Sequence, residues 1–150
     1  MDTGGEYGHP RGNGKRVELT IDSGAAEHVV GPRDLPHIPI GASRKHIQYT
    51  MANGQRTSNK GDQNAMAFTR DGHGITFRAQ VTDVHRPLMS VSRICDKGNR
   101  VVFEKHGGYI ESLTTGEQIH VRRDHNVYRL DVDVPESGFT RQGVNKSTYP

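Results

Sequence analysis

Alternation of apolar and polar residues is the feature of this sequence that most restricts its fold. Residues 17–21 and 75–81 carry an apolar side chain at every second position. Because successive side chains of a β-strand point to opposite faces, this period predicts strands with one buried face. Shorter apolar stretches that favour further strands lie at 47–51, 66–68, 101–103, 109–110, 119–121 and 127–134. We therefore expect an all-β fold.

Two dipeptides predict hairpin turns between these strands. Asn53-Gly54 and Asp71-Gly72 tolerate the positive φ angles that tight hairpins require. We expect the chain to return from the first turn through a strand that contains Met66 and Phe68. The second turn should lead into the strand at 75–81.

One segment, at 90–97, predicts a short helix. Ser90 can cap its N-terminus, and Gly98 stands where the helix would stop. Val91, Ile94 and Cys95 fall on one face of this segment. We therefore interpret Cys95 as a small buried side chain rather than a nucleophile.

The length of 150 residues suits a single domain. Segments 1–14 and 133–150 contain much glycine, proline and polar sequence, and we interpret them as a flexible N-terminal arm and a flexible C-terminal tail around a domain at 15–132. Leu, Ile, Val and Phe together number only 30, and Trp is absent. Since a small core is marginal by itself, this hints that a second subunit completes the fold.

Composition argues against several classes of function. The net charge is only +3, and neither the basic residues nor the nine aromatic residues are clustered, so a nucleic-acid partner is not expected. A single cysteine and nine histidines without metal-binding spacings predict no metal and no cofactor. The first 20 residues are polar and no apolar run is long enough to span a membrane, so we expect no signal peptide and no membrane partner.

The clearest sign of chemistry is a strand that runs directly into an aspartate. Asp22 follows the alternating residues 17–21 and precedes Ser23, Gly24 and Ala25. A carboxylate at the end of a buried strand is costly unless hydrogen-bond donors hold it, and Gly24 would let backbone N–H groups come close. An Asx turn that merely ends a strand explains the same residues. This motif alone therefore leaves both interpretations open.

Several further motifs, taken in order, resemble the retropepsin-like aspartic proteases, and most closely the protease domain of copia-type LTR retrotransposon Gag-Pol polyproteins. The Asp22-Ser23-Gly24-Ala25 segment, with His28 shortly after it, resembles the catalytic loop of that branch. The segments that resemble its flap, its helix region and its closing strand are 51–54, 87–98 and 126–130. The resemblance covers roughly residues 15 to 132. Two departures are Ser90, where retroviral enzymes carry Gly, and Ala26, where Thr or Ser is usual.

The resemblance implies a retropepsin-like closed β-barrel, with one short helix, that functions as a homodimer. Asp22 of each subunit would be catalytic, since the other tripeptide of this kind, at residues 2–4, has no strand before it. Ser23, Gly24 and Ala25 would support the catalytic loop. Packing under that loop would come from Leu88, Met89 and Ser90. The flap over the substrate would consist of Met51, Ala52, Asn53, Gly54 and Gln55.

The same resemblance implies an aspartic endopeptidase that cleaves its own polyprotein in the cytoplasm, transposon particles included. Candidate strands for the dimer interface are 15–20 and 127–134. Two alternatives remain open at this point. The chain can be a retropepsin-like dimer that binds peptides with little or no turnover, which Ala26 favours, or a small β-barrel that binds nucleic acid, which the scattered aromatic residues disfavour.

Overall fold

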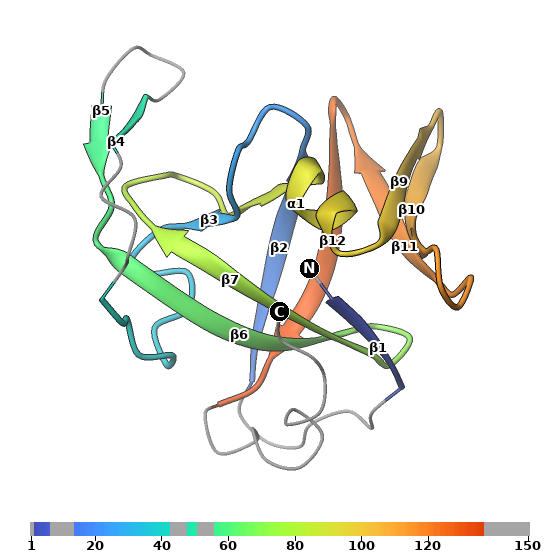
Figure 1. Ribbon diagram of the computed structural model, residues 1–150, viewed down its shortest axis with the longest axis horizontal. Helices are drawn as coiled ribbons and strands as arrows, with labels where there is room; N and C mark the ends of the chain where they lie inside the picture. Colours follow the sequence, from blue (N-terminus) through green and yellow to red (C-terminus); the bar gives the residue numbers. More distant parts are fainter. Residues whose placement is uncertain (1, 7–13, 43–47, 51–55, 137–150) are drawn as a thin grey trace.

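The computed structural model describes residues 2–6, 14–42, 48–50 and 56–136, and this part of the chain is mostly β-sheet with one short helix (Figure 1). The expected all-β class is therefore confirmed. The strands before the helix are β1 (Asp2–Glu6), β2 (Lys15–Asp22), β3 (Val29–Val30), β4 (Gln48–Thr50), β5 (Arg56–Ser58), β6 (Gly61–Thr69), β7 (His73–Val81) and β8 (Leu88–Ser90). Helix α1 (Val91–Asp96) follows, and then β9 (Asn99–Glu104), β10 (Gly107–Ser112), β11 (Gln118–Asp124) and β12 (Val127–Val134).

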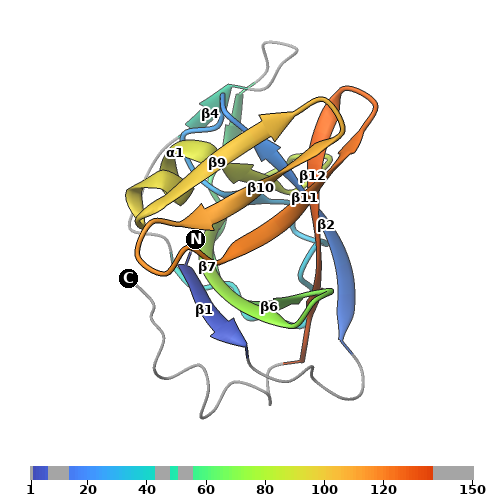
Figure 2. The same cartoon turned by 90° about the vertical axis from the view of Figure 1, so that its right-hand side faces the viewer.

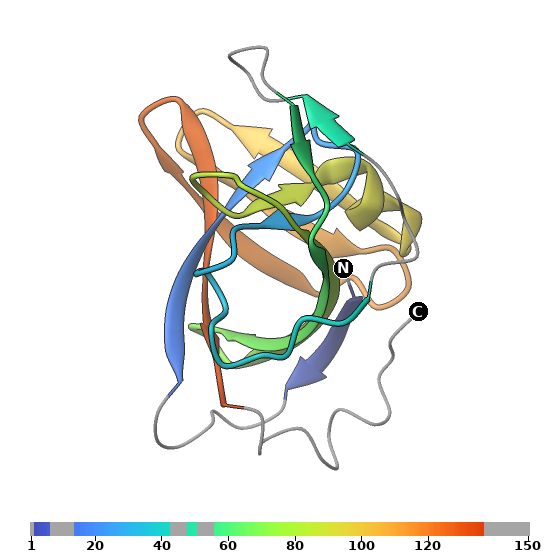
Figure 3. The same cartoon turned by 90° about the vertical axis from the view of Figure 1, so that its left-hand side faces the viewer.

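Ten of these strands form one sheet, in the order β1-β7-β3-β8-β2-β12-β11-β10-β9, and β6 pairs with both β7 and β12. Six successive pairings therefore lead from β2 through β12, β6, β7, β3 and β8 back to β2. Figure 3 shows β2 (blue) and β12 (orange) next to each other on one side of the interior, with the green strands β6 and β7 along its base and opposite side. Figure 2 shows β9, β10 and β11 side by side as an extension of this sheet beyond β12.

The alternating residues supply the core, as the sequence predicts. In β2, Val17, Leu19 and Ile21 are buried, whereas Glu18 is exposed. Strand β7 buries both faces over most of its length, and its edges pair with β6, β1 and β3. Burial of each large aliphatic or aromatic side chain contributes roughly 1.5–3 kcal/mol. The fully buried large side chains are Phe68, Phe77, Leu19, Leu35, Ile75, Met89, Ile94, Ile110, Ile119, Gln63, Val30 and Val81.

The expected N-terminal arm is wrong for part of its length. Residues 2–6 form β1, which pairs antiparallel with the edge of β7 so that Thr3 lies opposite Ile75. Backbone hydrogen bonding along an available strand edge does not depend on apolar side chains, which explains why the composition did not predict it. At the other end, β12 extends to Val134, beyond the expected domain limit at 132.

The first predicted hairpin exists, but its returning strand differs. Strand β4 pairs antiparallel with β5, with Tyr49 opposite Thr57. Met66 and Phe68 instead belong to β6, which pairs with β7. The turn residues 51–55 lie outside the described part of the chain.

The second predicted hairpin is confirmed. Asp71 and Gly72 connect β6 to β7, and Gly72 adopts a φ of 90°. Its backbone N–H donates to the carbonyl oxygen of Thr69 at 3.0 Å.

The short helix is confirmed with Ser90 as its N-cap, but Cys95 is exposed rather than buried. Ile94 is the buried residue of α1. Neighbouring helical positions are rotated by about 100°, so a helix of six residues that buries Ile94 turns Cys95 away.

The strands expected at a dimer interface pair with each other and with further strands of the same subunit. Residues 15–21 of β2 pair with β12. The other edge of β12 pairs with β11 near its start and with β6 near its end. The role of segments 15–20 and 127–134 in a dimer interface stays a prediction.

Candidate active site

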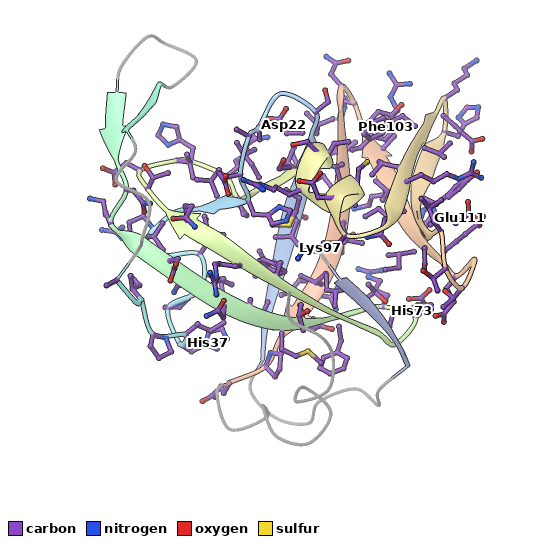
Figure 4. All side chains as sticks on the ribbon, in the orientation of Figure 1. Asp22, His37, His73, Lys97, Phe103 and Glu111 are labelled. Atoms are coloured by element: carbon purple, nitrogen blue, oxygen red, sulfur yellow. The ribbon has the colours of Figure 1, made fainter. Side chains whose placement is uncertain are left out.

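Asp22 lies where two parallel strands end together. In the register of β2 and β8, Ile21 lies opposite Met89 and Asp22 lies opposite Ser90. Figure 4 shows Asp22 beside α1, at the end of the molecule from which β4 and β5 project. The Asp22 side chain is half-buried, so a carboxylate at this point is supported by protein and still accessible.

The turn after Asp22 holds its carboxylate through the backbone. The N–H of Gly24 donates to Oδ1 of Asp22 at 2.7 Å, and the N–H of Ala25 donates to the Asp22 carbonyl oxygen at 3.4 Å. A Cβ added to Gly24 would lie 3.3 Å from Oδ1 of Asp22, which explains the glycine at this position. Within the described residues, Oδ2 of Asp22 has no hydrogen-bond partner. One oxygen is thus held, and the other is available for chemistry.

The rest of the predicted loop lies at the surface. Ser23 and Gly24 are exposed, and Ala25 is half-buried. The residues expected beneath the loop differ in their exposure, because Met89 and Ser90 are completely buried whereas Leu88 is half-buried. The predicted flap residues Met51, Ala52, Asn53, Gly54 and Gln55 lie outside the described part of the chain.

A buried histidine connects the segment after Asp22 to Ser90. Nδ1 of His28 accepts a hydrogen bond from the backbone N–H of Ser90 at 3.0 Å. The His28 ring also meets Phe77 edge to face, with centroids 6.1 Å apart. Burial, together with nearby positive charge that includes Arg93, lowers the pKa of His28 to about 3. The ring is therefore neutral throughout the mildly acidic range.

A second connection to the same segment comes from α1. The guanidinium of Arg93 forms an ion pair with Glu27, and its Nε donates to the Ala26 carbonyl oxygen at 3.3 Å. Ser90 Oγ accepts from the N–H of Arg93 at 3.2 Å, which caps the helix. The sequence analysis missed the Glu27–Arg93 pair, because the two residues are 66 positions apart and no local pattern marks them.

The site of one subunit contains one carboxylate. Among the described residues, no second carboxylate hydrogen-bonds to Asp22. Asp2, in the other Asp-Thr-Gly-type tripeptide, lies in β1 opposite Thr76. Chemistry that requires two adjacent carboxylates therefore needs Asp22 of another copy.

A pocket of about 510 Å³ lies apart from Asp22, against β10 and β11. Its lining includes Asp71, His106, Tyr109 and His120. Over the described ranges, no group of three or more His, Cys, Asp or Glu side chains is placed to hold a metal ion. Within the same ranges, no helix has the length and apolar character to cross a membrane.

We found no match for this chain among protein-family models, curated proteins or solved structures.

Proposed function

We propose that this protein is a retropepsin-like aspartic endopeptidase that acts as a homodimer and cleaves the retrotransposon polyprotein to which it belongs. The observation that carries the proposal is Asp22, at the paired ends of β2 and β8, with Oδ1 held by Gly24 and Oδ2 without a partner in the described chain. A strand-end carboxylate on a tight glycine turn suits a group that must be held rigidly and still reach a substrate.

The strand pairings support the finer assignment of the fold. The pairings that lead from β2 through β12, β6, β7, β3 and β8 back to β2 favour a closed barrel. The parallel pairing of β2 with β8 favours the retropepsin-like arrangement, because it brings the Asp22 loop against the N-terminus of α1.

The proposed chemistry uses the two Asp22 carboxylates of the dimer. Two carboxylates a few ångströms apart cannot both be charged without strong repulsion, so they share one proton. The charged member takes a proton from a water molecule, and that water attacks the peptide carbonyl carbon. The protonated member donates to the carbonyl oxygen as the tetrahedral intermediate forms. Proton transfer to the amide nitrogen then allows the C–N bond to break.

Two features support a polypeptide as the substrate. The β4–β5 ribbon projects at the end of the molecule that carries Asp22 (Figures 1 and 4), and in the proposed dimer it would cover a bound chain. An extended peptide can hydrogen-bond to strand backbones along its whole length, which suits a site made between β-structures. The half-buried Leu88 offers apolar contact close to Asp22.

The test is cleavage by the purified full chain at mildly acidic pH. Peptides that span the polyprotein are incubated with and without pepstatin, products are identified by mass spectrometry, and sedimentation gives the oligomeric state. We expect cleavage that pepstatin blocks and that Asp22→Asn abolishes while the variant remains a folded dimer. Asp133→Asn, which changes a partly exposed surface pair with Arg16, is the matched control and should cleave normally.

Two results would count against the proposal. Cleavage by Asp22→Asn at the wild-type rate would show that Asp22 is not catalytic. A dimer that binds the peptides without cleaving them would favour the peptide-binding alternative. If the chain is monomeric, two copies fused in tandem provide the second Asp22, and a silent fusion would also contradict the proposed activity.

A further inference from the structure

His28 joins three parts of the fold beside the candidate active site. Its Nδ1 accepts from the N–H of Ser90 in β8, its carbonyl oxygen accepts from the N–H of Gln80 in β7 at 2.8 Å, and its ring packs against Phe77. The two ends of the Ser90 bond are 62 positions apart in the chain. His28 is only 4% exposed, so these contacts are internal to the protein.

We propose that His28 is a positioning residue for Asp22. It holds the Ser90 end of β8 beside the Asp22 end of β2 through a neutral Nδ1 acceptor. The expected effect of His28 on kcat rests on the proposed protease function. The hydrogen bond between His28 and Ser90 is tested separately, without any activity.

Ser90 depends on His28 for a hydrogen-bond acceptor. Its N–H points to a side chain, His28, at the position where β8 becomes α1. Ser90 is completely buried, so an N–H that lost this acceptor would have no water to replace it. A buried donor without an acceptor is strongly unfavourable. Loss of Nδ1 therefore shifts Ser90, and the shift passes to Asp22 because the two residues are opposite each other in the parallel ladder.

The tautomer of the His28 ring follows from the same hydrogen bond. Because the N–H of Ser90 donates to Nδ1, that nitrogen carries a lone pair and the proton of the neutral ring is on Nε2. A proton on Nδ1 would point at the Ser90 N–H and break the contact. Arg93 on α1 adds a positive charge nearby, partly balanced by its ion pair with Glu27. These surroundings keep His28 neutral, and its acceptor role persists while a carboxylate pair takes up and releases protons.

The burial of His28 excludes a direct catalytic role. The buried ring has Nδ1 occupied by a backbone donor, so it has no route to a substrate in the open part of the site. His28 is thus expected to act through the position of Asp22 and not by proton transfer.

The kinetic test compares three substitutions. His28→Asn keeps an acceptor oxygen on Cγ, where Nδ1 is attached, whereas His28→Leu and His28→Phe retain bulk without an acceptor. We expect kcat to fall by about 10- to 100-fold in the Leu and Phe variants with KM nearly unchanged, because misplacement of reacting groups has effects of this size. His28→Asn should remain within about threefold of the wild type. Ile119→Val, a small loss of volume at a core position in β11, is the control for general destabilisation and should leave kcat unchanged.

A nuclear magnetic resonance measurement tests the contact without any activity. At pH 5, the ¹⁵N shifts of His28 should report an unprotonated Nδ1 and a protonated Nε2, and the Ser90 amide should be protected from hydrogen exchange. In His28→Leu, the amides of both Ser90 and Gly24 should exchange faster. Here Gly24 reports the turn that holds Asp22.

The outcomes separate this inference from the proposed function. An imidazolium or an Nδ1–H tautomer at pH 5 overturns it, and so does a Leu variant with the wild-type kcat. If the wild-type chain does not cleave peptides, the protease proposal fails, and the Gly24 and Ser90 exchange rates still decide the positioning role. Unchanged exchange of Gly24 in His28→Leu would then contradict it.

Discussion

The backbone N–H of Gly24 donates to Oδ1 of Asp22 at 2.7 Å, across a turn where an added Cβ at Gly24 would lie 3.3 Å from the same oxygen. This contact orients the carboxylate at the end of β2 without using a charged partner. Within the described residues, the second carboxylate oxygen has no hydrogen-bond partner. In the proposed dimer, Oδ2 of Asp22 in each subunit would face the Asp22 carboxylate of the other subunit.

Gly24→Ala should therefore impair catalysis more than folding. The added Cβ would lie 3.3 Å from Oδ1 of Asp22, so the carboxylate must move by a few tenths of an ångström. We expect kcat to fall by about tenfold or more, with a change in unfolding free energy of about 1 kcal/mol or less. Peptide cleavage and thermal unfolding measure the two effects.

Gly41→Ala provides the control for this substitution. Its added Cβ would lie 3.4 Å from Oδ1 of Asp62, which is a similar contact with a carboxylate outside the candidate site. Normal cleavage by Gly41→Ala together with a defect in Gly24→Ala would assign the effect to Asp22. Equal effects in the two variants would show that the turn has no special role.

The pH dependence of cleavage should report a shared proton. We expect activity to be highest at mildly acidic pH, where one carboxylate of the pair is charged and the other protonated. Cleavage should decline towards alkaline pH, as both members lose their protons, and towards strong acid, as both gain them. Rates measured from pH 3 to 9 test this expectation, and a rate unchanged at strongly alkaline pH would disprove it.

Conformational stability should decrease in acid because of His28. Burial lowers the pKa of this side chain to about 3 in the folded protein, from an ordinary 6.5 in the unfolded chain. Between these pH values the unfolded chain binds more protons than the folded protein. The stabilising contribution of neutral His28 is therefore complete above pH 6.5 and decreases as the pH falls towards 3. The total loss of stability over this range is on the order of 5 kcal/mol.

Urea unfolding from pH 3 to 7 measures this dependence. In His28→Asn, which has no titratable group at this position, the free energy of unfolding should vary less over the same range. An equal slope in the two proteins would show that other groups are responsible.

The Glu27–Arg93 pair should stabilise the segment after Asp22. Arg93→Met keeps most of the aliphatic stem and removes both the ion pair and the hydrogen bond to Ala26. Since the Arg93 side chain is 43% exposed, we expect a coupling with Glu27→Gln of only about 1 kcal/mol in a double-mutant cycle. The kcat should fall as well, since the pair holds the chain directly after the catalytic loop.

Arg100→Met is the matched control for that prediction. Arg100 forms an ion pair with Glu111 between β9 and β10, and its side chain is 55% exposed. Its removal should change stability by a similar amount and leave kcat unaltered. If both arginine variants reduced kcat equally, the effect would not arise from the Asp22 loop.

Local patterns in the sequence predicted several features correctly. The alternation at 17–21 and 75–81 marked β2 and β7, because side chains alternate between the two faces of a strand, although β7 buries both faces over most of its length. Asp71-Gly72 marked a turn and Ser90 marked a helix N-cap, since both depend on backbone angles and groups within a few residues. The same kind of local reasoning singled out Asp22 and the need for a glycine after it.

Other predictions failed because local patterns cannot rank distant partners. Strand β1 forms on an edge of β7 that becomes available only in the folded sheet. Met66 and Phe68 fit a strand equally well in either hairpin. In the structure they belong to the continuous antiparallel pairing of β6 with β7. Cys95 suited a buried helix face, but the packing of Ile94 set the rotation of α1.

The sequence by itself determined where the chain extends, where it turns, and which aspartate ends a buried strand, because each depends on neighbouring residues. Only the tertiary structure decided what surrounds that aspartate. The opposition of Asp22 and Ser90, the acceptor role of His28 and the Glu27–Arg93 pair all join positions more than 60 residues apart. Such contacts depend on which strands become neighbours in the sheet. The buried surroundings of His28 likewise exist only in the folded protein.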